Sequence, residues 1–274
     1  MSVKYQILLR VCDKVESVHN AARPFNLSKL QTIKLCFYSI YKSIQNYDHK
    51  ITIIGDQLSD ELIDFFEFFD NLVLLNENLG SASNSLNKQI DIASGIPNNE
   101  WIYLCEDDYL HTPYSFEYLT EFIENKDKYL ETSSKKKNFI NKIIGNLKNK
   151  PIIIHTADYP DRYDPPWKRL SFLFLSKHCH WRQITNTTHT VMLQSSTFKK
   201  FEKSIRNSAI GPSDSKLSSK VYGRIHFANK ALCLSPIHGL STHMTDGVMT
   251  PLVDWNDVYR RNIAEMKKIG IWND

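Results

Sequence analysis

The prediction of the fold class starts from the stretch "EWIYLCEDDYLHTP" at residues 100–113. It begins as an apolar run, typical of a buried strand, and ends in three consecutive carboxylates, Glu106, Asp107 and Asp108. Adjacent carboxylates repel each other, so we expect raised pKa values unless a cation or a basic side chain compensates them. Carboxylates at a strand end suit a hard divalent cation such as Mg²⁺ or Mn²⁺. The alternative is an exposed acidic turn with no ligand.

Further apolar runs precede this strand, and segments with helical spacing separate them. The expected strands lie at residues 5–12, 49–56, 71–77 and 100–107, and the expected helices at residues 30–45, 59–69 and 81–94. Strands that alternate with helices predict right-handed crossovers and a mostly parallel sheet. The fold class is therefore α/β, with a Rossmann-like central sheet flanked by helices.

Polar side chains fall where these expected strands end. Asp13, Asp56 and Asn78 each follow a strand, as does the acidic cluster after residue 105. In such sheets, ligands bind beyond the carboxyl ends of the strands. We therefore expect these side chains to line one site.

The second half of the chain has a different pattern and no linker. The expected elements are helices at 114–130 and 136–148, a strand at 150–158, a strand and helix at 189–205, a helix start within 211–224 and a strand at 230–244. We expect residues 1–274 to form a single domain.

Composition excludes several classes of protein. A net charge of +4 on 274 residues is too weak and scattered for a nucleic-acid binder. Five separated cysteines without a CxxC pair are typical of buried thiols in a reducing compartment, and no run approaches a membrane span or a signal peptide. We expect a cytoplasmic protein. The basic run at 135–150 is either a solvated helix face or a site of peripheral membrane contact.

The order of these pieces resembles the GT-A glycosyltransferases, particularly the inverting group that includes cellulose and chitin synthases. The matching pieces are "LLRVCD" (8–13), "ITIIGD" (51–56), "LGSASNSLNKQIDIASG" (79–95) and "WIYLCEDDY" (101–109). Glu106 replaces the first aspartate of the DxD motif of that group. No QxxRW motif follows, so a processive polysaccharide synthase is not expected.

The resemblance implies a division of the domain and a donor. Residues 1–112 would bind a nucleotide-sugar and a metal, 113–150 would be a helical segment, and 151–274 would bind the acceptor. The donor would be a nucleoside diphosphate sugar, with a UDP-sugar favoured. Asp56 would bind the base and Asp13 the base or ribose. The other residues implied on the donor side are Arg10, Asn84, Lys88, Glu106 and Asp107.

The same resemblance implies a metal and a catalytic base. Asp108 would bind Mn²⁺ or Mg²⁺, with Glu106 nearby and the late His243 as a further ligand, although His243 is equally well explained as a loop histidine. The acceptor would be a hydroxyl of a glycan or glycoconjugate. For an inverting reaction the base would be Asp214 by its place in the chain, with Asp158 as the second choice. Asp214 would also serve as a helix N-cap.

Aromatic residues in the second half, Tyr159, Tyr163, Trp167 and Trp181, would either form a platform for an acceptor sugar or pack loops against the core. Two other functions stay open. One is a nucleotidyltransferase, which usually has a glycine-rich loop after the first strand, whereas "RVCDKVESVHNAARP" has no glycine. The other is a non-catalytic carbohydrate- or nucleotide-binding protein.

Overall fold

The structure is a computed structural model that describes residues 3–15, 22–131, 147–165, 168, 170–211, 214–222 and 230–272. Among these residues, nine strands form one sheet in the order β3-β2-β1-β4-β9-β6-β10-β8-β7, and β11 and β5 form a second, two-stranded sheet. The strands are β1 (Lys4–Val11), β2 (Asp48–Asp56), β3 (Leu72–Glu77), β4 (Trp101–Glu106), β5 (Tyr109–His111), β6 (Ile152–Ile154), β7 (Leu173–Leu175), β8 (His180–Gln183), β9 (Val191–Gln194), β10 (Leu232–Ile237) and β11 (Ser241–His243). The α-helices are α1 (Lys29–Ile44), α2 (Asp60–Glu67), α3 (Ala82–Ser94), α4 (Ser115–Tyr129), α6 (Ser195–Ser208), α7 (Asp214–Val221) and α8 (Trp255–Lys268). Short 3₁₀ turns are η1 (Pro24–Asn26), η2 (Leu147–Asn149) and η3 (Pro160–Tyr163).

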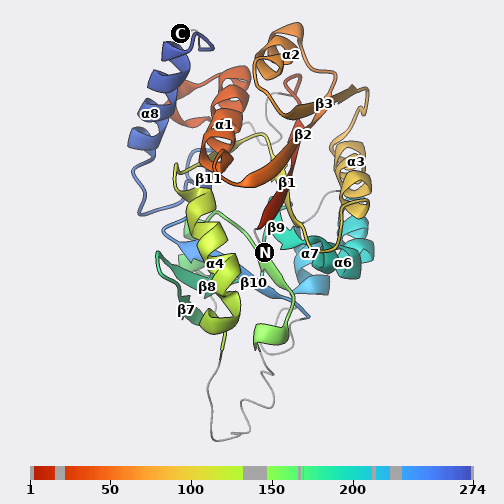
Figure 1. The fold of residues 1–274 in the computed structure, drawn as a ribbon, viewed down its shortest axis with the longest axis vertical. Helices are drawn as coiled ribbons and strands as arrows, with labels where there is room; N and C mark the ends of the chain where they lie inside the picture. The colour runs from red at the N-terminus through yellow and green to blue at the C-terminus, as the bar shows by residue number, and fades with distance from the viewer. Residues whose placement is uncertain are drawn as a thin grey trace, which may run out of the picture.

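The amino-terminal half follows the expected alternation of strands and helices. β1 pairs in parallel with both β2 and β4, and β2 pairs in parallel with β3. The carboxyl ends of these four strands therefore lie along one edge of the sheet. The α/β class, with a Rossmann-like central sheet between helices, is confirmed (Figure 1).

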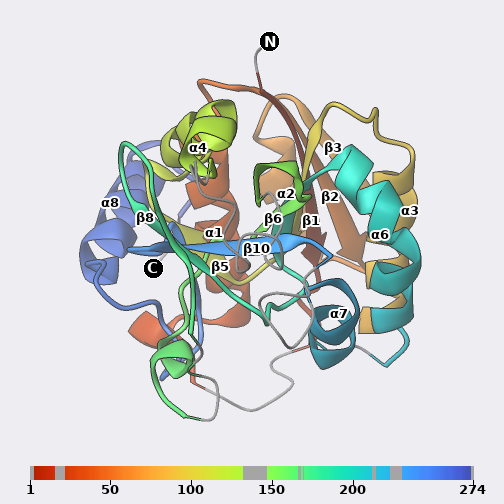
Figure 2. The same cartoon turned by 90° about the horizontal axis from the view of Figure 1, so that it is seen from below.

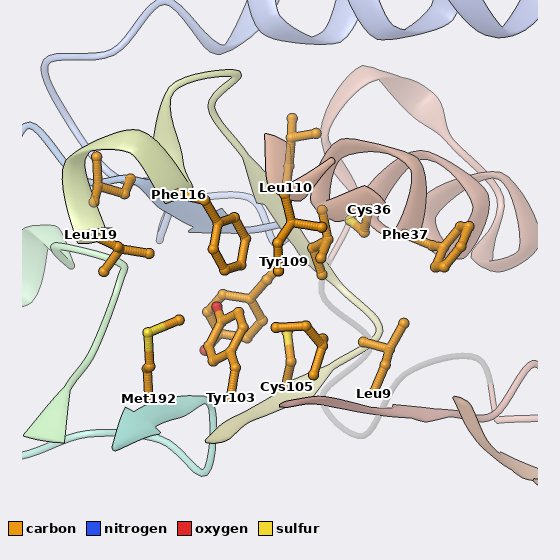
Figure 3. Packing of buried hydrophobic residues seen from close by; sticks show 14 of the residues in the cluster. Leu9, Cys36, Phe37, Tyr103, Cys105, Tyr109, Leu110, Phe116, Leu119 and Met192 are labelled. Atoms are coloured by element: carbon orange, nitrogen blue, oxygen red, sulfur yellow. The ribbon is translucent and has the colours of Figure 1, made fainter. Parts of the chain in front are cut away.

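Helices cover both faces of the sheet, and a separate core fills each interface (Figures 1 and 2). Along β1, Ile7 and Leu9 pack under α1, α2, α4 and α8, whereas Leu8 packs on the opposite face with α3, α6 and α7. Successive strand residues point to opposite faces, so a strand buried on both sides is apolar throughout. Figure 3 shows Tyr103 and Cys105 of β4 on the first of these faces, below the side chains of α1 and α4.

The carboxyl-terminal half extends the sheet with mixed pairing. β9 lies between β4 and β6 and is antiparallel to both, whereas β6 and β10 are parallel. The hairpin of β7 and β8 completes this side of the sheet. The helix expected at 136–148 lies outside the described residues, apart from its end at η2.

α1 is the helix that approaches the acidic cluster, and its start is well defined. Ser28 accepts a hydrogen bond from the backbone N–H of Gln31, while the Gln31 side chain accepts one from Ser28 N–H. This capping box satisfies two backbone donors that the helix itself leaves open. Further along, the Ser39 hydroxyl accepts from the backbone N–H of His111 and so joins α1 to β5.

Candidate functional site

The three carboxylates at the end of β4 point in different directions, and each has its own basic partner. Glu106 accepts a hydrogen bond from Arg10 Nη2 at 2.8 Å and another from the Thr190 hydroxyl at 3.1 Å. Arg10 lies opposite Glu106 in the pairing of β1 with β4, which explains why the two side chains meet. Glu106 therefore joins three neighbouring strands or their ends rather than standing free.

Asp107 points toward the start of α1. Its Oδ1 lies 2.6 Å from Lys29 Nζ, and its Oδ2 accepts the backbone N–H of Cys12 at 3.0 Å. The two side chains of this ion pair are only 13% and 10% exposed. Asp107 thus fastens the end of β4 to the end of β1 and to α1.

Asp108 points toward β11. His243 Nε2 lies 2.9 Å from Asp108 Oδ2, and Met244 donates its backbone N–H to the carbonyl of Asp108. The other carboxylate oxygen, Oδ1, is buried and makes no hydrogen bond with any residue that the structure describes. A buried carboxylate oxygen without a partner is costly, so this atom is available for a ligand.

Asp108 and His243 each favour the charged form of the other. Burial alone would raise the pKa of Asp108, but His243, Lys29 and Arg10 together lower that pKa below its usual range. Burial alone would lower the pKa of His243, but the carboxylates, Asp108 first, raise it. The repulsion expected among the acids is therefore compensated by bases on neighbouring elements.

The residues expected to bind the donor base lie along the same edge of the sheet. Asp56 ends β2 and accepts the backbone N–H groups of Leu79 and Gly80. Asp13 accepts the backbone N–H of Ser59 through Oδ2, while its Oδ1 is buried and has no hydrogen-bond partner in the described part of the chain. Asp56 shapes the loop before α3, and Asp13 presents a free acceptor.

Two other residues that were expected to bind the donor contact neighbouring side chains or backbone instead. Lys88 forms an ion pair with Glu77 at 2.5 Å. Asn84 is exposed and donates its side-chain N–H to the carbonyl of Leu79. Arg10 lies nearer the acidic cluster, and its Nε is buried without a partner among the described residues.

The two candidate bases occupy different settings. Asp214 begins α7, and its side chain lies outside the described part of the chain. α7 is attached near the acidic cluster, because Ser218 Oγ accepts the backbone N–H of Thr187, three residues before the Thr190 that contacts Glu106.

Asp158 is held in a buried ion-pair cluster. Arg182 and the Tyr163 hydroxyl donate to its carboxylate, and Arg162 Nη1 lies 3.8 Å away. The Asp158 side chain is 2% exposed. Such a carboxylate is bound too firmly to reach an acceptor hydroxyl without breaking these contacts.

Of the aromatic residues expected at the acceptor side, one packs in the core and another lies beside the candidate site. Trp181 is fully buried against Phe122, so it packs the core. Tyr159 lies beside the metal-ligand candidate, with its ring centroid 6.5 Å from that of His243, and its hydroxyl bonds to that of Tyr109. Trp167 lies outside the described residues.

The donor set at Asp108 fits a hard cation when a diphosphate supplies further ligands. Within the described ranges, no group of three or more His, Cys, Asp or Glu side chains is close enough to hold a metal ion by itself. Asp108 and His243 are the two candidate protein ligands. The unpartnered Oδ1 is the Asp108 atom that is available to a cation. Mg²⁺ is commonly held by one or two carboxylates plus substrate phosphates rather than by a protein cage.

Sequence reasoning missed Lys29 and Thr190, which hold two of the three carboxylates. Neither residue lies in a recognisable motif. Lys29 is 78 positions from Asp107 and Thr190 is 84 positions from Glu106. Only the fold brings them together, so no local signal could have identified them.

Comparison with known proteins supports the fold. No family model matches the chain, and no curated protein sequence matches it. Among solved structures, S. aureus TarS matches with a TM-score of 0.50 at 10% identity and covers 96% of this chain. This chain spans 40% of the length of that TarS structure.

Two other structures match less closely. They are galactosyltransferase LgtC in complex with donor and acceptor sugar analogs (TM-score 0.40, 7% identity, 78% of this chain and 69% of that one) and the Francisella tularensis cytidylyltransferase IspD (TM-score 0.42, 12% identity, 95% of this chain and 99% of that one). No helix in the described ranges has the length and apolar character needed to cross a membrane. With its parallel amino-terminal half and helices on both faces of the sheet, the chain has a GT-A-type fold.

Proposed function

We propose that the protein is a glycosyltransferase that moves a sugar from a nucleoside diphosphate sugar to a hydroxyl of a glycan or glycoconjugate. The observation that carries this proposal is the pairing of Asp108 with His243, at the carboxyl edge of a GT-A-type sheet, with Asp108 Oδ1 buried and unpartnered. Ligands of such sheets bind at this edge. A divalent cation, Mn²⁺ or Mg²⁺, held by Asp108 and His243 would act as a Lewis acid toward the departing diphosphate.

The donor nucleotide is proposed to lie over the ends of β1 and β2. Asp13 Oδ1 would accept a hydrogen bond from the ribose or base, because this buried atom has no other partner. Asp56 would face the base from the end of β2. Arg10, with its Nε free, is better placed than Lys88 to add positive charge near the diphosphate. A UDP-sugar is our first choice of donor.

For the acceptor, we assign the general base of an inverting reaction to Asp214. The start of an α-helix is a favourable position for an ionised carboxylate, and α7 is attached to the segment that holds Glu106. We assign Asp158 instead to the structural cluster with Arg162 and Arg182. Tyr159, beside His243, is the aromatic residue that we place against the acceptor sugar.

A thermal-shift panel tests this proposal. UDP, GDP, CDP and ADP are each added with and without Mn²⁺ to the native protein, to Asp108→Asn, and to the control Glu124→Gln, which changes an exposed acid on α4. A ligand at about 100 times its Kd adds roughly 2.7 kcal/mol, or several degrees in Tm for a domain of this size. We expect a Mn²⁺-dependent shift for one nucleotide that Asp108→Asn abolishes and Glu124→Gln retains.

The same panel separates the other functions. No shift with any nucleotide would contradict the proposal and make the acidic turn structural. A shift without Mn²⁺ that survives Asp108→Asn would favour a nucleotide-binding protein. Product analysis separates the two enzymes, because a glycosyltransferase releases a nucleoside diphosphate whereas a nucleotidyltransferase releases pyrophosphate from a nucleoside triphosphate.

A further inference from the structure

Lys29 occupies a position where a cation is unfavourable unless it has a specific partner. It is the first residue of α1, where the helix dipole favours negative charge. Its side chain is only 13% exposed, so its ammonium group has lost most of its water. Burial alone would lower the pKa of Lys29, but Asp107 and Asp108 raise it above its usual value. The chain therefore keeps a buried positive charge beside the acidic turn.

The contacts of Lys29 fix the direction of one carboxylate. Asp107 uses Oδ1 for Lys29 Nζ at 2.6 Å and Oδ2 for the backbone N–H of Cys12 at 3.0 Å. Both of its oxygens are thus occupied on the side of α1 and β1. The capping box at Ser28 fixes the backbone from which Lys29 projects, so this partner is rigidly presented.

The adjacent residue is held from the other side. Asp108 contacts His243 through its side chain, and its carbonyl accepts the backbone N–H of Met244. The two consecutive aspartates are therefore fastened to opposite neighbours, one to α1 and the other to β11. Without Lys29, Asp107 would keep only the backbone N–H of Cys12 as a partner, and its Oδ1 would be a second carboxylate oxygen without a partner on this turn, besides Asp108 Oδ1.

We propose that Lys29 is a positioning residue that keeps Asp107 out of the cation site and leaves Asp108 and His243 as the only protein ligands drawn from this turn and β11. The inference rests on the glycosyltransferase function proposed above. Lys29 acts through Asp107 and touches neither donor nor acceptor. It adjusts how firmly the cation is held, because the affinity of carboxylate sites follows the number of charges among their ligands.

The test is the variant Lys29→Met, which keeps the length of the side chain and removes its charge. Mn²⁺ binding is measured with the metal alone, by the electron paramagnetic resonance signal of the free ion, and kcat is measured separately with saturating Mn²⁺. We expect Mn²⁺ to bind about tenfold more tightly, because Asp107 becomes available to it. We expect kcat to fall by about 10-fold to 100-fold, as is typical when a residue that orients a metal ligand is lost.

Two further variants separate positioning from simple stabilisation. Lys29→Met combined with Asp107→Asn has the same net charge as the native protein and lacks the freed carboxylate, so both quantities should return to within about threefold of native. Lys29→Arg keeps a cation opposite Asp107 and should also remain within about threefold. If Lys29→Met alone does not fold, the double variant still tests whether Asp107 lies outside the cation site: Mn²⁺ affinity within about threefold of native is expected, and weaker binding would contradict the inference.

Three outcomes would overturn the inference. The first is a folded Lys29→Met protein with native Mn²⁺ affinity and native kcat. The second is weaker Mn²⁺ binding that Asp107→Asn does not restore, which would show that Lys29 only stabilises the fold. The third is unchanged Mn²⁺ binding in Asp108→Asn, which would remove the proposed cation site and the role of Lys29 with it.

Discussion

The buried histidine His111 should make the fold sensitive to acid by an amount that follows from its surroundings. It is 1% exposed, and burial lowers its pKa from 6.5 to about 3. Its Nδ1 lies 3.0 Å from the carbonyl of Tyr109, which can only accept, so Nδ1 carries the hydrogen. Nε2 then accepts the hydroxyl of Tyr103 at 2.9 Å. Both ring nitrogens of the neutral form have partners, and a second proton on Nε2 would require the Tyr103 hydroxyl to turn toward Thr156 and accept instead of donate.

The folded pKa lies below the unfolded pKa, so the stabilisation is present above about pH 6.5 and is lost as the pH falls toward about 3. Between about pH 7.5 and about pH 4.5, the unfolded chain takes up nearly one more proton here than the folded chain. This uptake lowers the free energy of unfolding by about 2.7 kcal/mol.

The variant that tests this is His111→Asn. Its side-chain amide can still donate to the carbonyl of Tyr109 but does not titrate. Urea unfolding, followed by tryptophan fluorescence at both pH values, gives the free energy of unfolding of each protein. On acidification, the free energy of unfolding of the native protein should fall by about 2.7 kcal/mol more than that of the variant. His155 is also buried with a lowered pKa, but it is present in both proteins and cancels in the comparison.

The control is His180→Asn, which removes an exposed imidazole and should leave the acid sensitivity of the native protein unchanged. If the native protein and His111→Asn differ in their acid loss by less than about 1 kcal/mol, then His111 takes up its proton almost as readily in the folded chain, and the reasoning is refuted.

Other substitutions test the site and its supports. Asp108→Asn should abolish Mn²⁺-dependent transfer while Tm changes little, and retained transfer with the same Mn²⁺ dependence would remove Asp108 from the site. Asp214→Asn should lower kcat by roughly 10²–10⁴-fold with the donor KM unchanged in steady-state assays; native kcat would exclude it as the base. Asp158→Asn should destabilise the fold by about 3–5 kcal/mol in urea unfolding, because it leaves two largely buried arginines without their anion. A stability loss below about 1 kcal/mol would show that these arginines do not depend on Asp158.

The amino-terminal half could be predicted because its signals are local. Each strand from β1 to β4 contains a short apolar run with an acidic residue at its end or two positions beyond it, and each following helix has an apolar face or a capping residue such as Ser28 or Ser81. The parallel direction of these strands then follows from their alternation with helices, whereas the position of β4 beside β1 does not. The observed bounds of α1, Lys29–Ile44, differ from the expected 30–45 by one residue at each end.

The carboxyl-terminal half was harder to predict because its strands are short and its pairing is not sequential. β9 enters the sheet between β4 and β6, and its four residues carry no signal for that place or for its antiparallel direction. α8 was not expected, although Asp254 caps its start and its apolar residues have helical spacing. A pattern of local periodicity does not contain the long-range pairing that decides such positions.

The acidic turn shows why adjacency in sequence is a poor guide to coordination. Successive residues at a strand end leave the backbone in different directions, so Glu106 meets Arg10, Asp107 meets Lys29 and Asp108 meets His243. Two of these partners, Arg10 and Lys29, form ion pairs with Glu106 and Asp107. The third partner is a histidine, whose ring nitrogen can itself be a metal ligand when it is neutral. In the proposed site, Asp108 is therefore the carboxylate whose partner would bind the cation together with it.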